Sequence, residues 1–176
     1  MVDVSVKDVT VRVAVAAGTV RTTPDVVALL RREALPKGDA LGVARIAGIM
    51  GAKRTPDLIP LCHPIALHGV EVQLDLGASS VDITATVRTA DRTGVEMEAL
   101  TAVATAGLAL IDMIKAVDPA AILDGVRVLR KEGGKTGRWI RPDEASSAEL
   151  AGAEPTSGAA QLAGAESTSN PAEVPR

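Results

Sequence analysis

Aromatic residues are almost absent from this 176-residue chain, which has no Phe, no Tyr and a single Trp, Trp139. Binding of nucleic acid by stacking bases on aromatic side chains is therefore not expected, and Val, Leu, Ile and Ala have to fill the core. Cysteine is equally scarce. Because Cys62 is the only one, no disulfide can form within the chain, which fits a reducing compartment.

Long hydrophobic runs are also missing. No stretch of about 18 uncharged apolar residues occurs, and Asp3, Lys7 and Asp8 interrupt the first valines, so no signal-peptide core is present there. These absences lead us to expect a cytoplasmic protein with no membrane partner.

Charge of one sign is not concentrated in the main part of the chain. The formal net charge is -3, from 22 acidic and 19 basic residues. Residues 143–176 contain six of the acidic residues and one of the basic ones, which leaves 16 acids and 18 bases in residues 1–142. That near-neutral balance tolerates a small anionic ligand. It is too weak to predict DNA or RNA binding, which requires a concentrated basic face.

The length predicts one domain, and composition divides the chain at residue 143. Residues 143–176 are rich in Ala, Gly, Ser, Pro and Glu, and LAGAEPTS at 150–157 returns as LAGAESTS at 162–169. Such a segment cannot bury enough apolar surface to offset its chain entropy. We predict a domain at 1–142 and a disordered tail at 143–176, with a docking role for the tail as the minor alternative.

The domain reads as mixed α and β. The expected elements are a strand at 10–16, a helix at 23–34 capped by Thr23, a helix at 39–54, a hairpin with strands at 70–76 and 81–87, a long helix at 95–117, a strand at 125–129, a glycine-rich turn at 133–137 and a short strand near Trp139. The simplest packing is an α+β fold, a ferredoxin-like antiparallel sheet with helices packed on one face.

Residues that can carry chemistry gather in residues 37–64. Pro60 and Pro64 restrict the backbone around His63, which can transfer protons near neutral pH or simply face solvent in a rigid loop. Cys62 and His63 are neighbours that would point to opposite sides of an extended chain, so we do not expect a nucleophile pair. A zinc site through Cys62, His63 and His68 lacks a fourth ligand.

Two further candidates lie on the long helix. Glu96 and Glu98 stand at its start, where carboxylates are favoured by the free backbone N–H groups, and this alone explains them. Asp112 and Lys115 share one helical face within the apolar run IDMIK. They form either an acid–base pair in a partly desolvated place or an ordinary surface ion pair.

The segment RKEGGKTG, with Lys131 and Lys135 beside Gly133 and Gly134, fits phosphate binding, but a hairpin turn with lysines has the same pattern. On one straight helix Glu98 and Asp112 would stand roughly 21 Å apart. A small substrate cannot touch both in one subunit, so a site that used both would combine two protomers.

Several segments, in order, resemble one family. They are MVDVS at the start, KGD at 37, AKRTPDLIPLCHP at 52–64, GVEMEALTAVATAGLALIDMIKAVD at 94–118 and GGKTG at 133–137. Together they resemble the cyclic pyranopterin monophosphate synthases of molybdenum cofactor biosynthesis. IPLCHP and GVEMEAL, at this separation, are the specific signals.

The resemblance implies a ferredoxin-like fold, a homohexamer built as a trimer of dimers, and active sites at subunit interfaces. It implies a lyase that converts a purine-derived triphosphate, 3',8-cyclo-7,8-dihydroguanosine 5'-triphosphate, to cyclic pyranopterin monophosphate with release of pyrophosphate. Asp112 matches the catalytic position with Lys115 as acid–base partner. The positions that match substrate contacts are Leu61, Cys62, His63, Met97, Glu98, Glu96, Lys37, Lys131 and Arg12.

No redox cofactor is required for such a step, and no metal is expected at the site. Mg2+ on the pyrophosphate is compatible with the reaction, although the sequence shows no dedicated carboxylate cage. Family members often have residues before MVDVS, which leaves open whether an N-terminal segment is missing here. A second class of function also stays open, a non-catalytic, oligomeric nucleotide-binding or regulatory protein that uses the same basic site.

Overall fold

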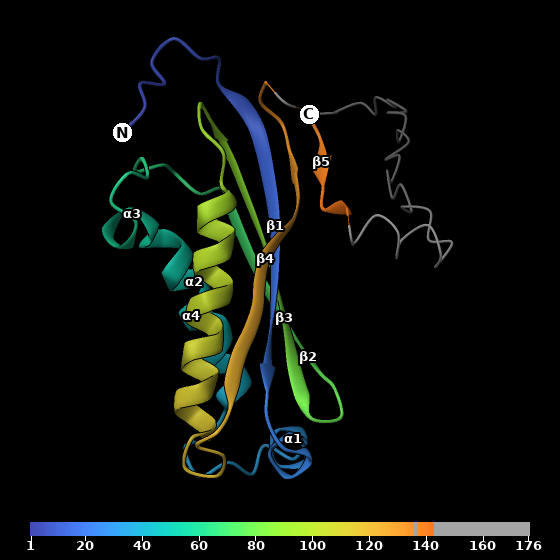
Figure 1. The fold of residues 1–176 in the computed structure, drawn as a ribbon. Coiled ribbons are helices and arrows are strands. Elements are labelled where there is room, and N and C mark those ends of the chain that lie inside the picture. The colour runs from blue at the N-terminus through green and yellow to red at the C-terminus, as the bar shows by residue number, and fades with distance from the viewer. Residues whose placement is uncertain (136, 143–176) are drawn as a thin grey trace, which may run out of the picture.

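The computed structural model describes residues 1–135 and 137–142, and these form one antiparallel sheet with helices against it (Figure 1). The elements, in chain order, are β1 (Thr10–Arg21), α1 (Pro24–Arg31), α2 (Ala40–Lys53), α3 (Thr55–Leu58), β2 (Gly69–Leu76), β3 (Ser80–Asp91), α4 (Glu96–Ile114), β4 (Ile122–Glu132) and β5 (Trp139–Ile140). The tail predicted at 143–176 lies outside the described residues.

The connections define a split β-α-β arrangement. The strand order is β2-β3-β1-β4-β5, and each pair of neighbours is antiparallel. With α2 between β1 and β2, and α4 between β3 and β4, the first four strands have the ferredoxin-like topology. The predicted α+β fold is therefore confirmed, and β5 extends the sheet beyond β4.

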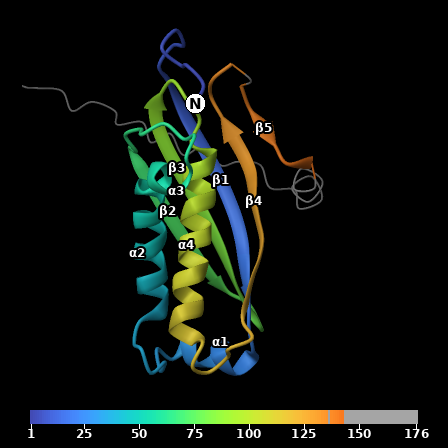
Figure 2. The same cartoon turned by 60° about the vertical axis from the view of Figure 1, so that its left-hand side comes forward.

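Helices α2 and α4 lie side by side over one face of the sheet, as the turned view shows (Figure 2). Helix α4 packs on β1, β3 and β4, and α2 packs on β2 and α4. The largest fully buried side chains are aliphatic, among them Ile83, Leu110 and Ile114. An aromatic-free core is thus filled by branched aliphatic side chains and alanines, as the composition predicts.

Small residues bring α2 and α4 close together. A Cβ atom added to Gly48 would stand 3.0 Å from the carbonyl oxygen of Ala102, and one added to Gly51 would stand 2.0 Å from Oγ1 of Thr105. At these glycines the backbone and short side chains of α4 fill the space next to α2. The distance between the two helices is therefore fixed within narrow limits.

Strand β1 is longer than the alternating pattern at 10–16 predicts. It continues to Arg21 and pairs with β3 along its whole length. The pattern fades because Gly18 has no side chain: a Cβ there would stand 2.8 Å from Val103 of α4. The strand therefore depends on its sheet neighbours and on the helix, which a local pattern does not record.

Helix α1 begins as the sequence indicates and ends in an unusual conformation. Oγ1 of Thr23 accepts a hydrogen bond from the N–H of Val26, with Pro24 at the first helical position. After the last turn Glu33 has a φ of 52°, the left-handed region that favours glycine. The chain then turns towards Lys37 and α2.

Helix α4 is the central helix of the domain. By length and composition its residues Glu96–Ile114 could cross a membrane, but half of that stretch is buried against the rest of the protein. Its start and end agree with the predicted 95–117 to within a few residues. Val117 and Asp118 both donate backbone hydrogen bonds to the carbonyl of Ile114, which closes the helix before Pro119.

Candidate active site

The predicted site residues form two groups, one at each end of α4. Helix α3 and the loop after it lie beside the N-terminal end of α4, and α1 lies near the C-terminal end (Figure 1). Glu98 and Asp112 are fourteen positions apart on this continuous helix, which corresponds to roughly 21 Å. The single chain therefore brings each group together but keeps the two groups apart.

Asp112, at the C-terminal end of α4, lies between two lysines. Nζ of Lys115 is 2.7 Å from Oδ1, and Nζ of Lys37 is 2.7 Å from Oδ2. Lys37 also donates to the main-chain carbonyl of Asp112 at 2.7 Å. It reaches this position because Asp39 caps α2 by accepting from the N–H of Gly42, which anchors the loop that carries Lys37.

The two ammonium groups control the ionisation of Asp112. Hydrogen bonds from Lys115 and then Lys37 lower its pKa from 3.8 to about 2, because both stabilise the charged form. Of the two alternatives for this pair, a partly desolvated one and a surface one, the exposure of 54% of the Asp112 side chain fits the surface ion pair. The result is a group of two cations and one anion that faces solvent, with a net positive charge.

A pocket of about 370 Å³ lies at the N-terminal end of α4. Its lining consists of Leu61, Cys62, His63, Thr93, Gly94, Glu96, Met97 and Glu98. Cys62 and His63 therefore line the same pocket, and the extended chain assumed for this segment is wrong. The cause is local: the N–H of Cys62 donates to the carbonyl of Ile59 at 3.0 Å, so the chain turns there and is not extended.

Glu98 differs most from its sequence interpretation. It is only 3% exposed, so a general preference of carboxylates for helix starts does not account for it. Burial raises its pKa, and the charge of Glu96 adds to this effect. Burial also raises the pKa of Cys62, with a further contribution from the charge of Glu98. The pocket therefore holds one carboxyl group that is poorly solvated.

Lys131 and Arg12 extend this site towards the sheet. Nζ of Lys131, on β4, is 2.9 Å from Oε1 of Glu96. Arg12, on β1, donates from Nε to the carbonyl of Asp91 at 2.9 Å and from Nη2 to that of Arg92 at 3.2 Å. Both line a cleft of about 60 Å³ beside the first pocket.

The glycine-rich turn lies directly against Arg12. Gly134 has a φ of 74°, and a Cβ atom there would stand 2.1 Å from Nη1 of Arg12. The turn is therefore in close contact with the Arg12 guanidinium, and phosphate binding by the turn itself stays a prediction. Glycine is favoured at this position by its backbone conformation.

The described residues contain no cluster of side chains that would support the alternative of a zinc site. Nδ1 of His68 accepts a hydrogen bond from the N–H of Ala90 at 3.3 Å. In residues 1–135 and 137–142 no three His, Cys, Asp or Glu side chains lie close enough together to hold a metal ion. Thr93, which sequence reasoning did not select, lines the pocket because it immediately precedes the GVEMEAL segment, whose first residue, Gly94, also lines it.

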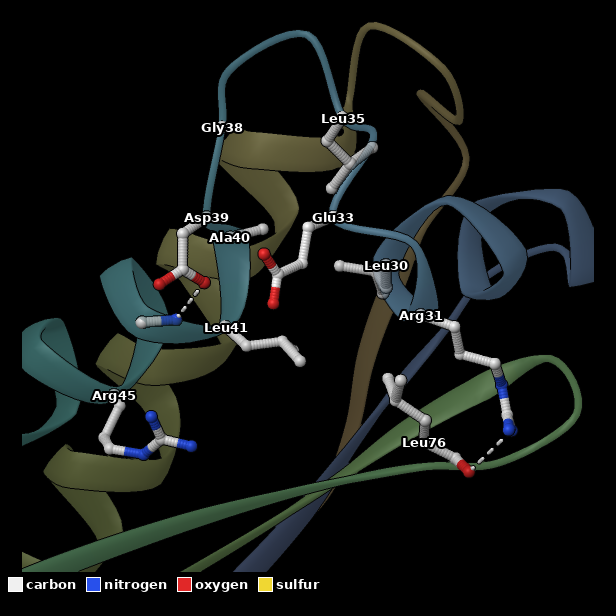
Figure 3. A pocket seen from close by; sticks show the side chains of 11 residues that line it. Leu30, Arg31, Glu33, Leu35, Gly38, Asp39, Ala40, Leu41, Arg45 and Leu76 are labelled. Atoms are coloured by element: carbon white, nitrogen blue, oxygen red, sulfur yellow. Dashed lines mark hydrogen bonds between the residues drawn. The ribbon is translucent and has the colours of Figure 1, made fainter.

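A separate hollow of about 440 Å³ lies between α1, α2 and β2 (Figure 3). The side chain of Glu33 extends into it between Leu30 and Leu41, and Arg31 donates to the carbonyl of Leu76 at 3.2 Å on its far side. None of the predicted site residues lines this hollow, although it includes Gly38, the residue after Lys37.

Comparison with known proteins covers both groups of site residues. Residues 1–134 match the family model described as the MoaC family. A Streptomyces coelicolor protein named cyclic pyranopterin monophosphate synthase is 64% identical over 141 residues, which are 80% of this chain and 83% of the relative. A Mycobacterium tuberculosis protein named cyclic pyranopterin monophosphate synthase 2 is 63% identical over 141 residues, 80% and 84% of the two chains. A Corynebacterium efficiens protein named cyclic pyranopterin monophosphate synthase is 60% identical over 139 residues, 79% and 90% of the two chains.

Proposed function

The chain belongs to the MoaC family, and we propose that the two groups of residues at the ends of α4 are the two halves of the active site in which it forms cyclic pyranopterin monophosphate. The chain is an enzyme of molybdenum cofactor biosynthesis, and the lyase class fits the name that relatives 60–65% identical carry. Its substrate is 3',8-cyclo-7,8-dihydroguanosine 5'-triphosphate, and pyrophosphate is the second product. The cytoplasm is the proposed location.

The observation that carries this assignment is Asp112 held between Lys37 and Lys115, with both bonds at 2.7 Å. A carboxylate whose pKa is about 2 is a poor proton acceptor at neutral pH. Asp112 therefore orients the two ammonium groups, and Lys115 is the proton donor. When the phosphates of the substrate draw the lysines towards themselves, Asp112 loses its stabilising hydrogen bonds and becomes more basic.

The pocket at the other end of α4 suits the ring system of the substrate. Leu61 and Met97 provide exposed apolar surface there, 70% and 36% exposed respectively, for the flat face of a purine-derived ring. The buried carboxyl of Glu98 is an acceptor for ring N–H groups. In a poorly hydrated pocket such a bond discriminates strongly, because an unmatched ligand leaves the carboxyl without a partner.

The phosphate chain needs cations, and Lys131 and Arg12 lie next to the ring pocket. Both line the adjoining cleft, and Lys131 is already held by Glu96 at 2.9 Å. Lys37 and Lys115 add positive charge from the other half. Charge-assisted hydrogen bonds from these groups stabilise a triphosphate without a metal ion, so no cofactor is required and Mg2+ is an optional companion of the pyrophosphate.

The two halves of the site meet only if two protomers combine. Glu98 and Asp112, near the two ends of α4, are roughly 21 Å apart, which a single small substrate does not span. We therefore place the active site between protomers, with the His63 half from one and the Asp112 half from its partner. A dimer contains two such sites, and a trimer of dimers, a homohexamer, is the proposed assembly.

Incubation of the purified protein with the cyclic triphosphate tests the assignment, with pyrophosphate release and pterin fluorescence as readouts. Asp112→Ala and Lys115→Ala should lower turnover about 100-fold or more, while Asp124→Ala, which breaks the exposed contact with Arg21 on the sheet, should not. A correctly folded wild-type oligomer that binds the triphosphate without turnover would favour the nucleotide-binding alternative.

A further inference from the structure

A second pocket lies beside Lys131, and four of its six lining residues belong to none of the site positions described above. It has a volume of about 480 Å³ and is lined by Glu96, Val128, Lys131, Arg138, Trp139 and Arg141. Glu96 and Lys131 also line the cleft with Arg12, so the two hollows adjoin at this ion pair. The residues that match the family model end at 134, so Arg138, Trp139 and Arg141 lie beyond that match.

The short strand β5 places the new residues. It pairs antiparallel with β4, and the register sets Trp139 directly opposite Lys131. The N–H of Arg141 donates to the carbonyl of Leu129 at 2.7 Å, which fixes the end of the strand. Residues directly opposite each other in an antiparallel pair point to the same face of a sheet. The single aromatic side chain of the protein is thus held beside a proposed phosphate-binding lysine.

Arg141 is positioned by two contacts that leave its terminal nitrogens available. Its Nε donates to the carbonyl of Val128 at 2.7 Å. Its Cζ atom lies 5.8 Å from the centre of the Trp139 ring, within the range of a cation–π contact. No carboxylate in the described part of the chain lies within ion-pair distance of Arg141, and the remaining two nitrogens form the paired donors that bind phosphate oxygens.

Positive charge predominates in this pocket. Lys131, Arg138 and Arg141 stand against one carboxylate, Glu96, which Lys131 already pairs at 2.9 Å. Arg138 is 3.9 Å from Glu132, at the outer limit of an ion pair. The pocket therefore offers two guanidinium groups to an anion, beside an indole that lowers the local exposure to water.

We propose that this pocket is a pyrophosphate subsite, which holds the β- and γ-phosphates of the substrate and then the pyrophosphate that leaves. The proposal rests on the proposed function. When the cyclic phosphate closes, an oxygen of the sugar-derived part loses its proton and bonds to the α-phosphorus, while the bond from the α-phosphorus to the bridging oxygen breaks. Pyrophosphate takes that electron pair, and the negative charge develops where Arg141 and Lys131 can stabilise it.

Titration calorimetry of the full chain with inorganic pyrophosphate tests this subsite. Arg141→Gln should weaken binding about 10-fold to 100-fold, the effect of losing a charge-assisted pair of hydrogen bonds. Arg141→Lys keeps the charge but loses the fork and the ring contact, and should weaken binding about 3-fold to 10-fold. Arg32→Gln is the matched control, because Nε of Arg32 also donates to a backbone carbonyl, that of Ala28 at 3.2 Å, at the far end of the protein.

The outcomes separate the two proposals. Weaker pyrophosphate binding by Arg141→Gln and Arg141→Lys, with Arg32→Gln unchanged, supports the subsite even if the wild type shows no turnover. Wild-type affinity in both Arg141 variants overturns the subsite even if turnover is normal. If Arg141→Gln has a lowered melting temperature, Arg141→Lys decides. Absence of pyrophosphate binding by the wild type also overturns the subsite.

Discussion

Substitution of Gly51 by alanine would test whether close packing of α2 against α4 sets the geometry of the site. A Cβ at this position would stand 2.0, 2.7 and 2.8 Å from Oγ1, Cγ2 and Cβ of Thr105. Because the Cβ of Thr105 is itself too close, no side-chain rotation of Thr105 relieves the clash. The helices have to shift, and overpacking of this kind costs about 1–3 kcal/mol.

The same substitution also improves helix propensity, by about 1 kcal/mol. We expect the free energy of unfolding of Gly51→Ala to fall by about 0–2 kcal/mol, although an exposed helical Gly→Ala change would raise it. A double-mutant cycle removes the propensity term. In a Thr105→Ala background the clash is reduced to one atom, and Gly51→Ala should be tolerated better there by about 1–2 kcal/mol.

Urea denaturation at one fixed protein concentration measures the wild type and the three variants, since the stability of an oligomer depends on protomer concentration. The loop with Lys37 precedes α2 and the loop with His63 follows it, so the turnover of Gly51→Ala should fall together with its stability. A coupling below about 0.5 kcal/mol between positions 51 and 105, or a stabilised Gly51→Ala, would refute the packing argument.

Three further predictions concern single side chains. Glu98→Gln should raise the free energy of unfolding at neutral pH. Burial raises the pKa of the Glu98 carboxyl above its ordinary value of 4.5, so the wild-type protein becomes less stable as the pH rises above 4.5. Urea melts at several pH values should show that the difference between the two proteins vanishes below pH 4.5. The ion pairs of Asp112 should stabilise the fold above its ordinary pKa of 3.8, and this stabilisation should be lost as the pH falls towards 2. In Asp112→Asn the melting temperature should therefore fall less steeply than in the wild type between pH 3.8 and pH 2. Glu33→Gly should raise the free energy of unfolding by about 0.5–1 kcal/mol. The left-handed conformation of Glu33 costs residues other than glycine about 1–2 kcal/mol, and the greater chain entropy of glycine in the unfolded state offsets part of the gain. Glu33→Ala, measured in parallel, should show no such gain.

Local patterns predicted the elements that carry a periodic signal. The hairpin of β2 and β3 follows from alternating Val, Leu and Ile residues, and α4 follows from its unbroken helical pattern and the stop at Asp118 and Pro119. The length of strand β1 was underestimated because Gly18 interrupts the alternating pattern. A glycine stands there because Val103 of α4 lies too close for a side chain. Tertiary contact decides such a residue, and a single-sequence pattern does not record it.

The site residues were named from motifs, but their relations were not accessible from spacing. Lys37 and Asp112 are 75 positions apart, and only the fold shows that their side chains meet. The sequence left open whether Asp112 is exposed, and it gave no sign that Glu98 is buried. Both depend on which loops cover an end of α4, and no periodicity of the helix itself contains that information.

The most direct test of the central claim mixes two variants that are each inactive. Asp112→Ala damages one half of the site and His63→Ala the other. After subunit exchange, a site between protomers should regain about a quarter of wild-type activity, since about half of randomly formed pairs are mixed and each has one intact site of two. No recovered pyrophosphate release, with exchange confirmed by differently tagged subunits, would contradict a site shared between protomers.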